Sequence, residues 1–238
     1  MSFMCCRAAR PGRARAGSIA SVRREAATHR DRAAREWRTS RPTLERVTRI
    51  VAGVLGGRRL TVPAGQGTRP TSDRVREALF SSLDNLVDLD GARFADLYAG
   101  SGAVGLEACS RGAAHVLLAE NDAKAARIIR GNIAALGVAG RVRLVTDKVE
   151  RLLAGESDGA FDAVFIDPPY AVTDERVRAV LDALVARWLA PDAVVVVERS
   201  SRGAPMAWPD GLRAVAERRY GETVLWYARR EQDGSRTS

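Results

Sequence analysis

Four consecutive residues, Asp167-Pro168-Pro169-Tyr170, combine the side chains in this sequence that are best suited to chemistry. They follow the apolar run 163–166, whose β-branched and aromatic residues are typical of a buried strand in a parallel sheet. Proline has no N–H to donate to a strand ladder, so the strand must end at Asp167. We therefore expect a carboxylate, a stiff turn and an aromatic ring at the carboxyl end of a strand, where ligands bind in open α/β sheets. Taken alone, the four residues fit a plain strand-ending turn equally well.

A glycine-rich loop is the second candidate for a ligand site. Gly100, Gly102 and Gly105 form a G-x-G-x-x-G pattern between a predicted strand, 92–98, and a predicted helix, 102–111. Such glycines let the backbone approach a ligand closely, and the helix start offers N–H groups and a positive dipole to a carboxylate or phosphate. The pattern alone is not specific, because nicotinamide and flavin enzymes share it.

Two carboxylates near this loop distinguish between the possible ligands. Asp96 lies four residues before Gly100, and Glu120 ends the next predicted strand, where it can accept hydrogen bonds from ribose hydroxyls. A dinucleotide carries a pyrophosphate, which Asp96 would repel. S-adenosylmethionine instead carries an ammonium and a sulfonium, which attract a carboxylate, and a carboxylate that suits the helix start. The sequence therefore favours S-adenosylmethionine over NAD.

Strands and helices alternate through the region that contains both motifs. Strands are predicted at 92–98, 114–120, 142–146, 163–167 and 193–198, and helices at 102–111, 122–136 (ending at Gly137), 148–153 and 173–189. Two last strands, 213–219 and 223–228, have no helix between them and should form an antiparallel hairpin. This pattern predicts an α/β protein with a doubly wound sheet that carries one antiparallel strand.

A smaller element precedes the alternating region. Residues 49–53 and 58–62 flank Gly56-Gly57, which predicts a small β-hairpin with the glycines supplying positive φ. A Gly-rich link, 63–67, then leads to a helix that Ser72 or Asp73 can cap.

The apolar face of that helix is predicted to consist of Val75, Leu79, Leu83 and Leu86. Arg74 and Arg76 lie on its other face. Composition favours a solvated helix surface for these two arginines over contacts to phosphates.

Composition excludes several classes of protein. The 238 residues are 46% apolar and 28% charged, as in a globular protein with one main core. We find no apolar run near the roughly 20 residues that a membrane helix needs. Cys5, Cys6 and Cys109 do not make a disulfide framework or a zinc site, and His29 and His115 lie too far apart for a metal cluster.

The positive charge is concentrated at the start of the chain. Residues 1–46 hold 12 of the 38 basic and 4 of the 29 acidic residues, which leaves 26 basic and 25 acidic residues for 47–238. Any RNA-binding surface of the folded part must therefore be a local patch.

Four regions are expected along the chain. Residues 1–46 form an Arg-rich, disordered leader, which we interpret as a dispensable tail or the result of a start codon assigned too far upstream, in preference to a transit peptide. Residues 47–90 form the hairpin and helix extension, 91–230 the main domain, and 231–238 a disordered tail.

From about Thr48 to Arg230, the chain resembles the bacterial 16S rRNA (guanine(966)-N2)-methyltransferase family. The matching stretches are 69–77, 96–108 and 167–170, of which the first is the most particular to this family. The resemblance implies the Rossmann-like, seven-stranded class I methyltransferase sheet, with strand order 3-2-1-4-5-7-6 and the last strand antiparallel.

The resemblance also implies roles for individual residues. The predicted catalytic residues are Asp167, Pro168, Pro169 and Tyr170. The residues predicted to bind S-adenosylmethionine are Asp96, Tyr98, Gly100, Ser101, Gly102, Gly105, Glu120 and Asp147, although Asp147 fits a helix cap nearly as well. The residues predicted to bind RNA are Arg58, Arg59, Arg69, Arg74 and Arg76.

The catalytic prediction has a chemical basis. The lone pair of an exocyclic amine is conjugated into the base, and two acceptors for its hydrogens, the Asp167 carboxylate and the Pro168 carbonyl, would localise it. Tyr170 can stack on an exposed base.

For the protein as a whole, we expect a cytoplasmic, monomeric enzyme that acts on 16S rRNA or a small-subunit assembly intermediate. The alternatives are a methyltransferase for DNA adenine or cytosine or for protein glutamine, and a non-catalytic RNA-assembly factor that binds S-adenosylmethionine.

Overall fold

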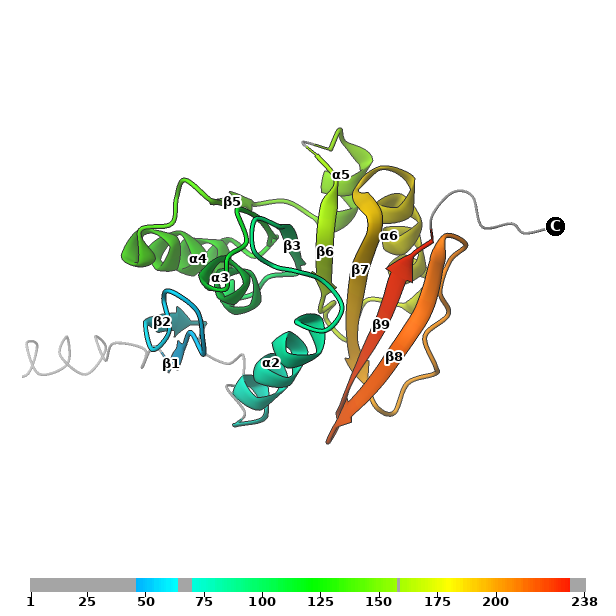
Figure 1. Ribbon diagram of the computed structural model, residues 1–238, viewed down its shortest axis with the longest axis horizontal. Helices are drawn as coiled ribbons and strands as arrows, with labels where there is room; N and C mark the ends of the chain where they lie inside the picture. Colours follow the sequence, from blue (N-terminus) through cyan, green and yellow to red (C-terminus); the bar gives the residue numbers. More distant parts are fainter. Residues whose placement is uncertain (1–45, 64–69, 158, 232–238) are drawn as a thin grey trace, which may run out of the picture. The chain divides into compact units, whose positions relative to one another are not determined.

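The computed structural model describes residues 46–63, 70–157 and 159–231, which all belong to one compact unit. Its centre is a seven-stranded sheet with the order β5-β4-β3-β6-β7-β9-β8 (Figure 1). Numbered from β3 in chain order, this is the predicted order 3-2-1-4-5-7-6, so the predicted sheet is confirmed. The strands are β3 (Arg93–Leu97), β4 (His115–Ala119), β5 (Val142–Val145), β6 (Phe161–Ile166), β7 (Leu189–Ser200), β8 (Leu212–Tyr220) and β9 (Thr223–Arg230). β9 runs antiparallel to both of its neighbours, as the terminal hairpin predicted.

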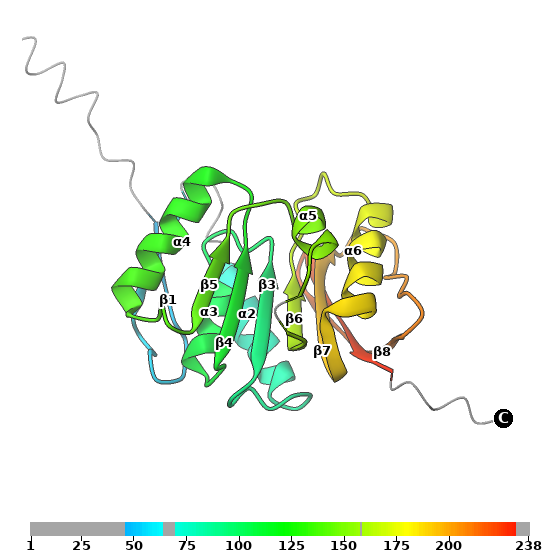
Figure 2. The same cartoon turned by 90° about the horizontal axis from the view of Figure 1, so that it is seen from above.

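Five helices cover the sheet in the described part of the chain. They are α2 (Pro70–Leu83), α3 (Ala103–Ser110), α4 (Ala123–Leu136), α5 (Val149–Ala154) and α6 (Asp174–Arg187). Figure 2 shows α5 and α6 on the near side of the sheet and α2 and α3 behind it. None of the helices described is long and apolar enough to cross a membrane.

Alternate residues of each strand belong to two separate cores. Phe94, Phe165 and Val196 pack in the core that includes residues of α2, α3 and α4. Leu97 and Ile166 pack in the other core, with residues of α5 and α6. A strand turns successive side chains to opposite faces, so a residue's place in a strand decides which layer it reaches.

Two helix termini show how far local rules determine the element boundaries. The Asp122 side chain caps α4 by accepting from the backbone N–H groups of Lys124 and Ala125, and α4 ends at Gly137 with φ of 71°, as predicted. The predicted cap of α2 at Ser72 or Asp73 is wrong, because the helix already begins at Pro70. Proline suits the first turn of a helix, where no N–H partner is needed.

The N-terminal hairpin consists of β1 (Arg46–Arg49) and β2 (Arg59–Val62), paired antiparallel in a separate two-stranded sheet. The first strand lies earlier than the predicted 49–53. The reason is that the N–H groups of Val51 and Ala52 donate to the Glu107 carboxylate of α3, at 2.7 and 2.9 Å. In the connection, Gly53 and Gly57 have positive φ, whereas Gly56 does not.

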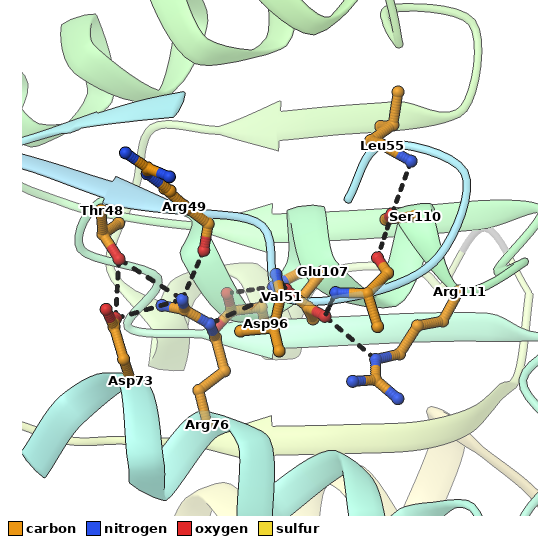
Figure 3. A network of polar contacts seen from close by, with 12 residues as sticks. Thr48, Arg49, Val51, Leu55, Asp73, Arg76, Asp96, Glu107, Ser110 and Arg111 are labelled. Carbon is orange, nitrogen blue, oxygen red and sulfur yellow. Dashed lines mark hydrogen bonds and ion pairs between the residues drawn. The ribbon is translucent and has the colours of Figure 1, made fainter. Parts of the chain in front are cut away.

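A buried ionic network attaches this hairpin to α2 and α3 (Figure 3). Glu107 has no exposed surface, and besides the two N–H groups it faces Arg111 Nε at 3.1 Å and Arg76 Nε at 3.8 Å. Arg76 also donates to the carbonyl of Arg49 at 2.6 Å and to Asp73 at 3.1 Å. The hairpin is therefore held by charge-assisted hydrogen bonds from two helices.

A side-chain amide makes a second attachment. Asn132 of α4, 4% exposed, accepts from the Thr61 N–H and donates to the Thr61 carbonyl, both at 2.9 Å. It also donates to the Ser101 carbonyl in the glycine loop at 3.1 Å. One side chain thus connects β2, α4 and the glycine loop.

Candidate active site

A cavity of about 1190 Å³ opens at the carboxyl ends of β3, β4, β6 and β7. The glycine loop and the turn after β6 form part of its wall, and Thr48, Val62 and Val75 of the N-terminal extension form another part. The predicted catalytic and cofactor-binding residues that line it are Asp96, Tyr98, Gly100, Ser101, Glu120, Asp167, Pro168, Pro169 and Tyr170. The structure therefore brings the two sequence motifs to one cavity.

Asp96 is fixed at the end of β3. It is 2% exposed, and one carboxylate oxygen accepts the Gly105 N–H at 2.9 Å. Tyr98, two residues later, has φ of 65°, a left-handed conformation that is uncommon outside glycine. Gly100 and Gly102 follow with φ of 57° and 76°. These three residues with positive φ turn the chain sharply from the strand into α3.

The third glycine of the motif serves packing. A Cβ at Gly105 would lie 2.2 Å from Leu118 Cδ2, so only glycine lets α3 approach β4 this closely. A Cβ at Gly102 would likewise meet Leu118, at 3.2 Å. Neither glycine lines the cavity. In the structure Gly102 forms part of the turn and Gly105 allows the close helix–strand contact, while their contact with the cofactor stays a prediction.

Glu120 follows β4 and is 7% exposed. Its two oxygens accept N–H groups from Gly100 at 2.8 Å and Asp122 at 2.7 Å, so it holds the glycine loop beside the start of α4. Asp147, predicted to contact adenine, does not line the cavity. It accepts from the Lys148 N–H at 2.7 Å and pairs with Arg151 at 3.2 Å, but the N-cap of α5 is Lys148, so Asp147 is not the helix cap that the sequence left open.

The turn after β6 has the predicted form. The Asp167 N–H makes the last bond of the strand, to the Leu97 carbonyl at 3.3 Å, and the Val172 N–H closes the turn on the Pro169 carbonyl at 2.8 Å. The Tyr170 ring beside the cavity is 84% exposed. A ring this exposed can stack on a planar group that enters from solvent.

Burial raises the pKa of three carboxyl groups of the cavity. Enclosure by protein raises the pKa of Asp167 to about 6, although water reaches the group through the cavity and nearby Arg199 acts in the opposite direction. Burial raises the pKa of Asp96 to about 7; the Gly105 N–H lowers it, and Asp167 and Glu120 raise it further. The pKa of Glu198 rises to about 8 through burial and the neighbouring Asp167. Crowded carboxyl groups of this kind favour a cationic ligand.

Comparison with known proteins agrees with this geometry. A model of the family described as conserved hypothetical protein 95 matches residues 48–229. The chain belongs to this family. The protein named "Ribosomal RNA small subunit methyltransferase D" of Escherichia coli K12 is 36% identical over 188 residues, which are 78% of this chain and 91% of the relative. The protein of the same name from Haemophilus influenzae is 31% identical over 182 residues, 76% of this chain and 92% of the relative. The family resemblance predicted from the sequence is confirmed.

Solved structures confirm the class I methyltransferase fold of this family member. The structure described as "Putative methyltransferase yhhF from Escherichia coli" is 34% identical, with a TM-score of 0.69, and covers 78% of this chain and 99% of its own. The magnesium protoporphyrin IX methyltransferase of Synechocystis, at 15% identity and a TM-score of 0.56, shares the fold alone. It covers 71% of this chain and 87% of its own.

Sequence reasoning missed Glu198 and Arg199, which both line the cavity. The strand predicted at 193–198 ends at Glu198, so the rule that pointed to Asp167 could have found it too. Arg199 donates to Asp174 at 2.6 Å and to the Val172 carbonyl, and thereby links β7 to the start of α6.

The arginines predicted to bind RNA differ in their exposure to solvent. Arg58, Arg59 and Arg74 are exposed, and Arg58 donates to the Ala135 carbonyl at 2.7 Å. Arg76 is 6% exposed and engaged in the network around Glu107, so it is placed to hold the hairpin and not to meet phosphates from solvent. Arg69 lies outside the described residues, as do residues 1–45 of the predicted leader and 232–238 of the predicted tail.

Proposed function

We propose that the protein transfers a methyl group from S-adenosylmethionine to the exocyclic N2 of a guanine in 16S rRNA. The observation that carries this proposal is the Asp167-Pro168-Pro169-Tyr170 turn, which lines one cavity with the glycine loop in a chain related to ribosomal RNA methyltransferases. The names of the relatives support ribosomal RNA as the substrate. The choice of guanine N2 rests on the family resemblance of the sequence.

The residues of the cavity fit S-adenosylmethionine, which supplies an electrophilic methyl group on a cationic sulfur. Asp96 and Glu120, beside the glycine loop, give the cavity two carboxyl groups that attract the sulfonium and the ammonium. The start of α3, which no side chain caps, can receive the carboxylate. A pyrophosphate would meet the same carboxyl groups and be repelled, so a dinucleotide does not fit.

The protein then acts by holding the amine. The Asp167 carboxylate and the Pro168 carbonyl accept its two hydrogens, which localises the nitrogen lone pair, and Tyr170 stacks on the base. After methylation the nitrogen is strongly acidic and gives up a proton readily, so a strong general base is not required. Orientation and electrostatics therefore account for most of the catalysis.

The test is transfer of labelled methyl to naked 16S rRNA and to assembled small subunits, with mapping of the modified nucleotide. Asp167→Ala should lower kcat by about a hundredfold or more, the scale for removing one preorganised polar contact, and leave S-adenosylmethionine binding unchanged. Asp182→Ala is the matched control, because Asp182 lies on the exposed side of α6. Modification of another base, or transfer to DNA or a glutamine side chain, would reject the proposed substrate. Binding of S-adenosylmethionine without methyl transfer to RNA, DNA or glutamine would support the alternative of a non-catalytic RNA-assembly factor.

The RNA-contacting surface is proposed to include Arg58, Arg59 and Arg74. Reversing Arg58 and Arg59 to Glu should weaken RNA binding and reduce the slope of log Kd against log salt by about one unit or more, because fewer counterions are released. Arg178→Glu, on α6, is the control. An unchanged affinity and slope would reject the surface.

A further inference from the structure

The carboxyl group of Glu198 lies beside Asp167, the proposed acceptor for the amine. β6 and β7 are parallel neighbours, and the last pair in register is Ile166 with Val197. Asp167 directly follows Ile166, and Glu198 directly follows Val197. Paired residues of adjacent strands share a face, and Ile166 and Val197 both turn to the core with α5 and α6. Asp167 and Glu198 therefore turn to the opposite face, and both line the cavity.

Glu198 is held there from a third strand. The Thr223 hydroxyl of β9 hydrogen-bonds its carboxyl group. Asp167 acts on its charge, and Glu198 in turn acts on Tyr227. The other charged residues that line the same cavity are Asp96, Glu120, Asp122, Glu222, Arg76 and Arg199. Arg199 is paired with Asp174, and Arg76 with Asp73 and Glu107. The balance around Glu198 is therefore acidic, and one of two neighbouring carboxyl groups is best kept protonated.

Guanine differs from other amine-bearing bases in the groups next to its exocyclic amine. Beside N2 it offers the ring N1–H, a donor, and then O6, an acceptor, whereas adenine and cytosine place a ring nitrogen acceptor beside their amines. A protonated carboxyl group has one donor and one acceptor side by side. It can accept from N1–H and donate to O6 while the adjacent carboxylate accepts from N2.

We propose that Glu198 is a specificity-determining residue that reads the N1–H and O6 of guanine while Asp167 and Pro168 hold N2. The inference rests on the proposed function and deepens it, because it gives a chemical reason for guanine. The pKa of Glu198, raised to about 8 by burial and by Asp167, agrees with a protonated side chain at neutral pH.

The experiment compares two target bases in wild-type and variant proteins. Small-subunit RNA is ligated from fragments so that the mapped nucleotide is either guanine or 2-aminopurine, which keeps the N2 amine but lacks N1–H and O6. Wild type should prefer guanine in kcat/KM by about tenfold or more, the usual scale for a bidentate base contact. Glu198→Ala should lose this preference through slower methylation of guanine.

A conservative variant separates reading of the base from mere packing. Glu198→Gln keeps one donor and one acceptor, so it should retain the preference for guanine. Glu217→Gln, on the exposed strand β8, is the control. Each variant is first checked for S-adenosylmethionine affinity and thermal unfolding equal to wild type; if Glu198→Ala fails to fold, Glu198→Leu takes its place.

Three results would overturn the inference. They are an unchanged preference in Glu198→Ala, a preference lost equally in Glu198→Gln, and a wild type that methylates both bases equally well. A wild type that methylates neither base would instead reject the proposed function itself, and the two failures are therefore distinguishable.

Discussion

Glu107 is the residue whose loss should most clearly expose how the N-terminal extension is held. Glu107→Ala removes the acceptor of two backbone N–H groups, of Val51 and Ala52, and the partner of Arg76 and Arg111. Removing one member of a buried ionic group leaves the other charge unpaired, which destabilises a protein by about 3–5 kcal/mol. Val51 is 39% exposed, so water can replace one bond, and we expect about 3 kcal/mol.

This loss is large against the total stability of a domain, about 5–15 kcal/mol. In a protein of this size it corresponds to a decrease in Tm of roughly 10 °C. Glu107→Gln keeps an oxygen acceptor but loses the charge, so its effect should be about half as large. Equilibrium unfolding in urea gives the free energies of unfolding. Hydrogen exchange should show faster exchange of the Val51 and Ala52 amides.

The control is Glu156→Ala, which removes an exposed carboxylate and should change stability by less than about 0.5 kcal/mol. A loss below about 1 kcal/mol in Glu107→Ala, with unchanged exchange at Val51 and Ala52, would refute the view that this network holds the hairpin.

Three further predictions concern the cavity and the glycine loop beside it. Asp96→Asn should weaken S-adenosylmethionine binding about tenfold or more in calorimetry, because a charge next to the glycine loop is lost; equal affinity would contradict this. Gly105→Ala should destabilise the protein by about 1–3 kcal/mol in urea unfolding, since its Cβ would lie 2.2 Å from Leu118; a neutral change would show that α3 can shift. The pKa is raised from 3.8 to about 7 at Asp96, from 3.8 to about 6 at Asp167, and from 4.5 to about 8 at Glu198. The folded protein therefore binds protons at these groups more tightly than the unfolded chain does. Without cofactor, the free energy of unfolding should therefore fall as pH rises from about 4 to about 8, and Glu198→Gln should flatten the upper part of that profile; a stability that rises across this range would contradict the raised pKa values.

The sheet and the cavity could be predicted from the sequence because their determinants are local. Strand and helix patterns fixed the order of elements, and residues at strand ends, such as Asp167 and Glu120, had to meet at one edge. The predicted strand 193–198 is longer in the structure, since β7 begins at Leu189 and passes Pro191 with Asp192 at φ of 61°. An irregular strand start of this kind depends on neighbouring strands that local patterns do not describe.

The N-terminal extension was predicted less well because distant residues decide its structure. The partners of Val51 and Ala52 lie more than 50 residues away in the chain, in Glu107. The sequence pattern places Arg76 on the polar face of an amphipathic helix. Its burial depends on acceptors in β1 and α3, which the local pattern does not reveal. A charged residue surrounded by its own partners looks, in sequence, like a surface residue.

The burial of Arg76 indicates a structural role for residues 69–77, the stretch most particular to the family. Within its described part, Asp73 and Arg76 bind each other, Thr48 and the carbonyl of Arg49, and so fix β1 as a wall of the cavity. We therefore infer that the stretch acts on the substrate through the position of the hairpin, and among its described residues Arg74 is an exposed cation. By the proposal for Glu198, base identity is read elsewhere, at the carboxyl ends of β6 and β7. If this division of roles holds, changes at Arg76 should alter RNA affinity and KM, whereas changes at Glu198 should alter the choice of base.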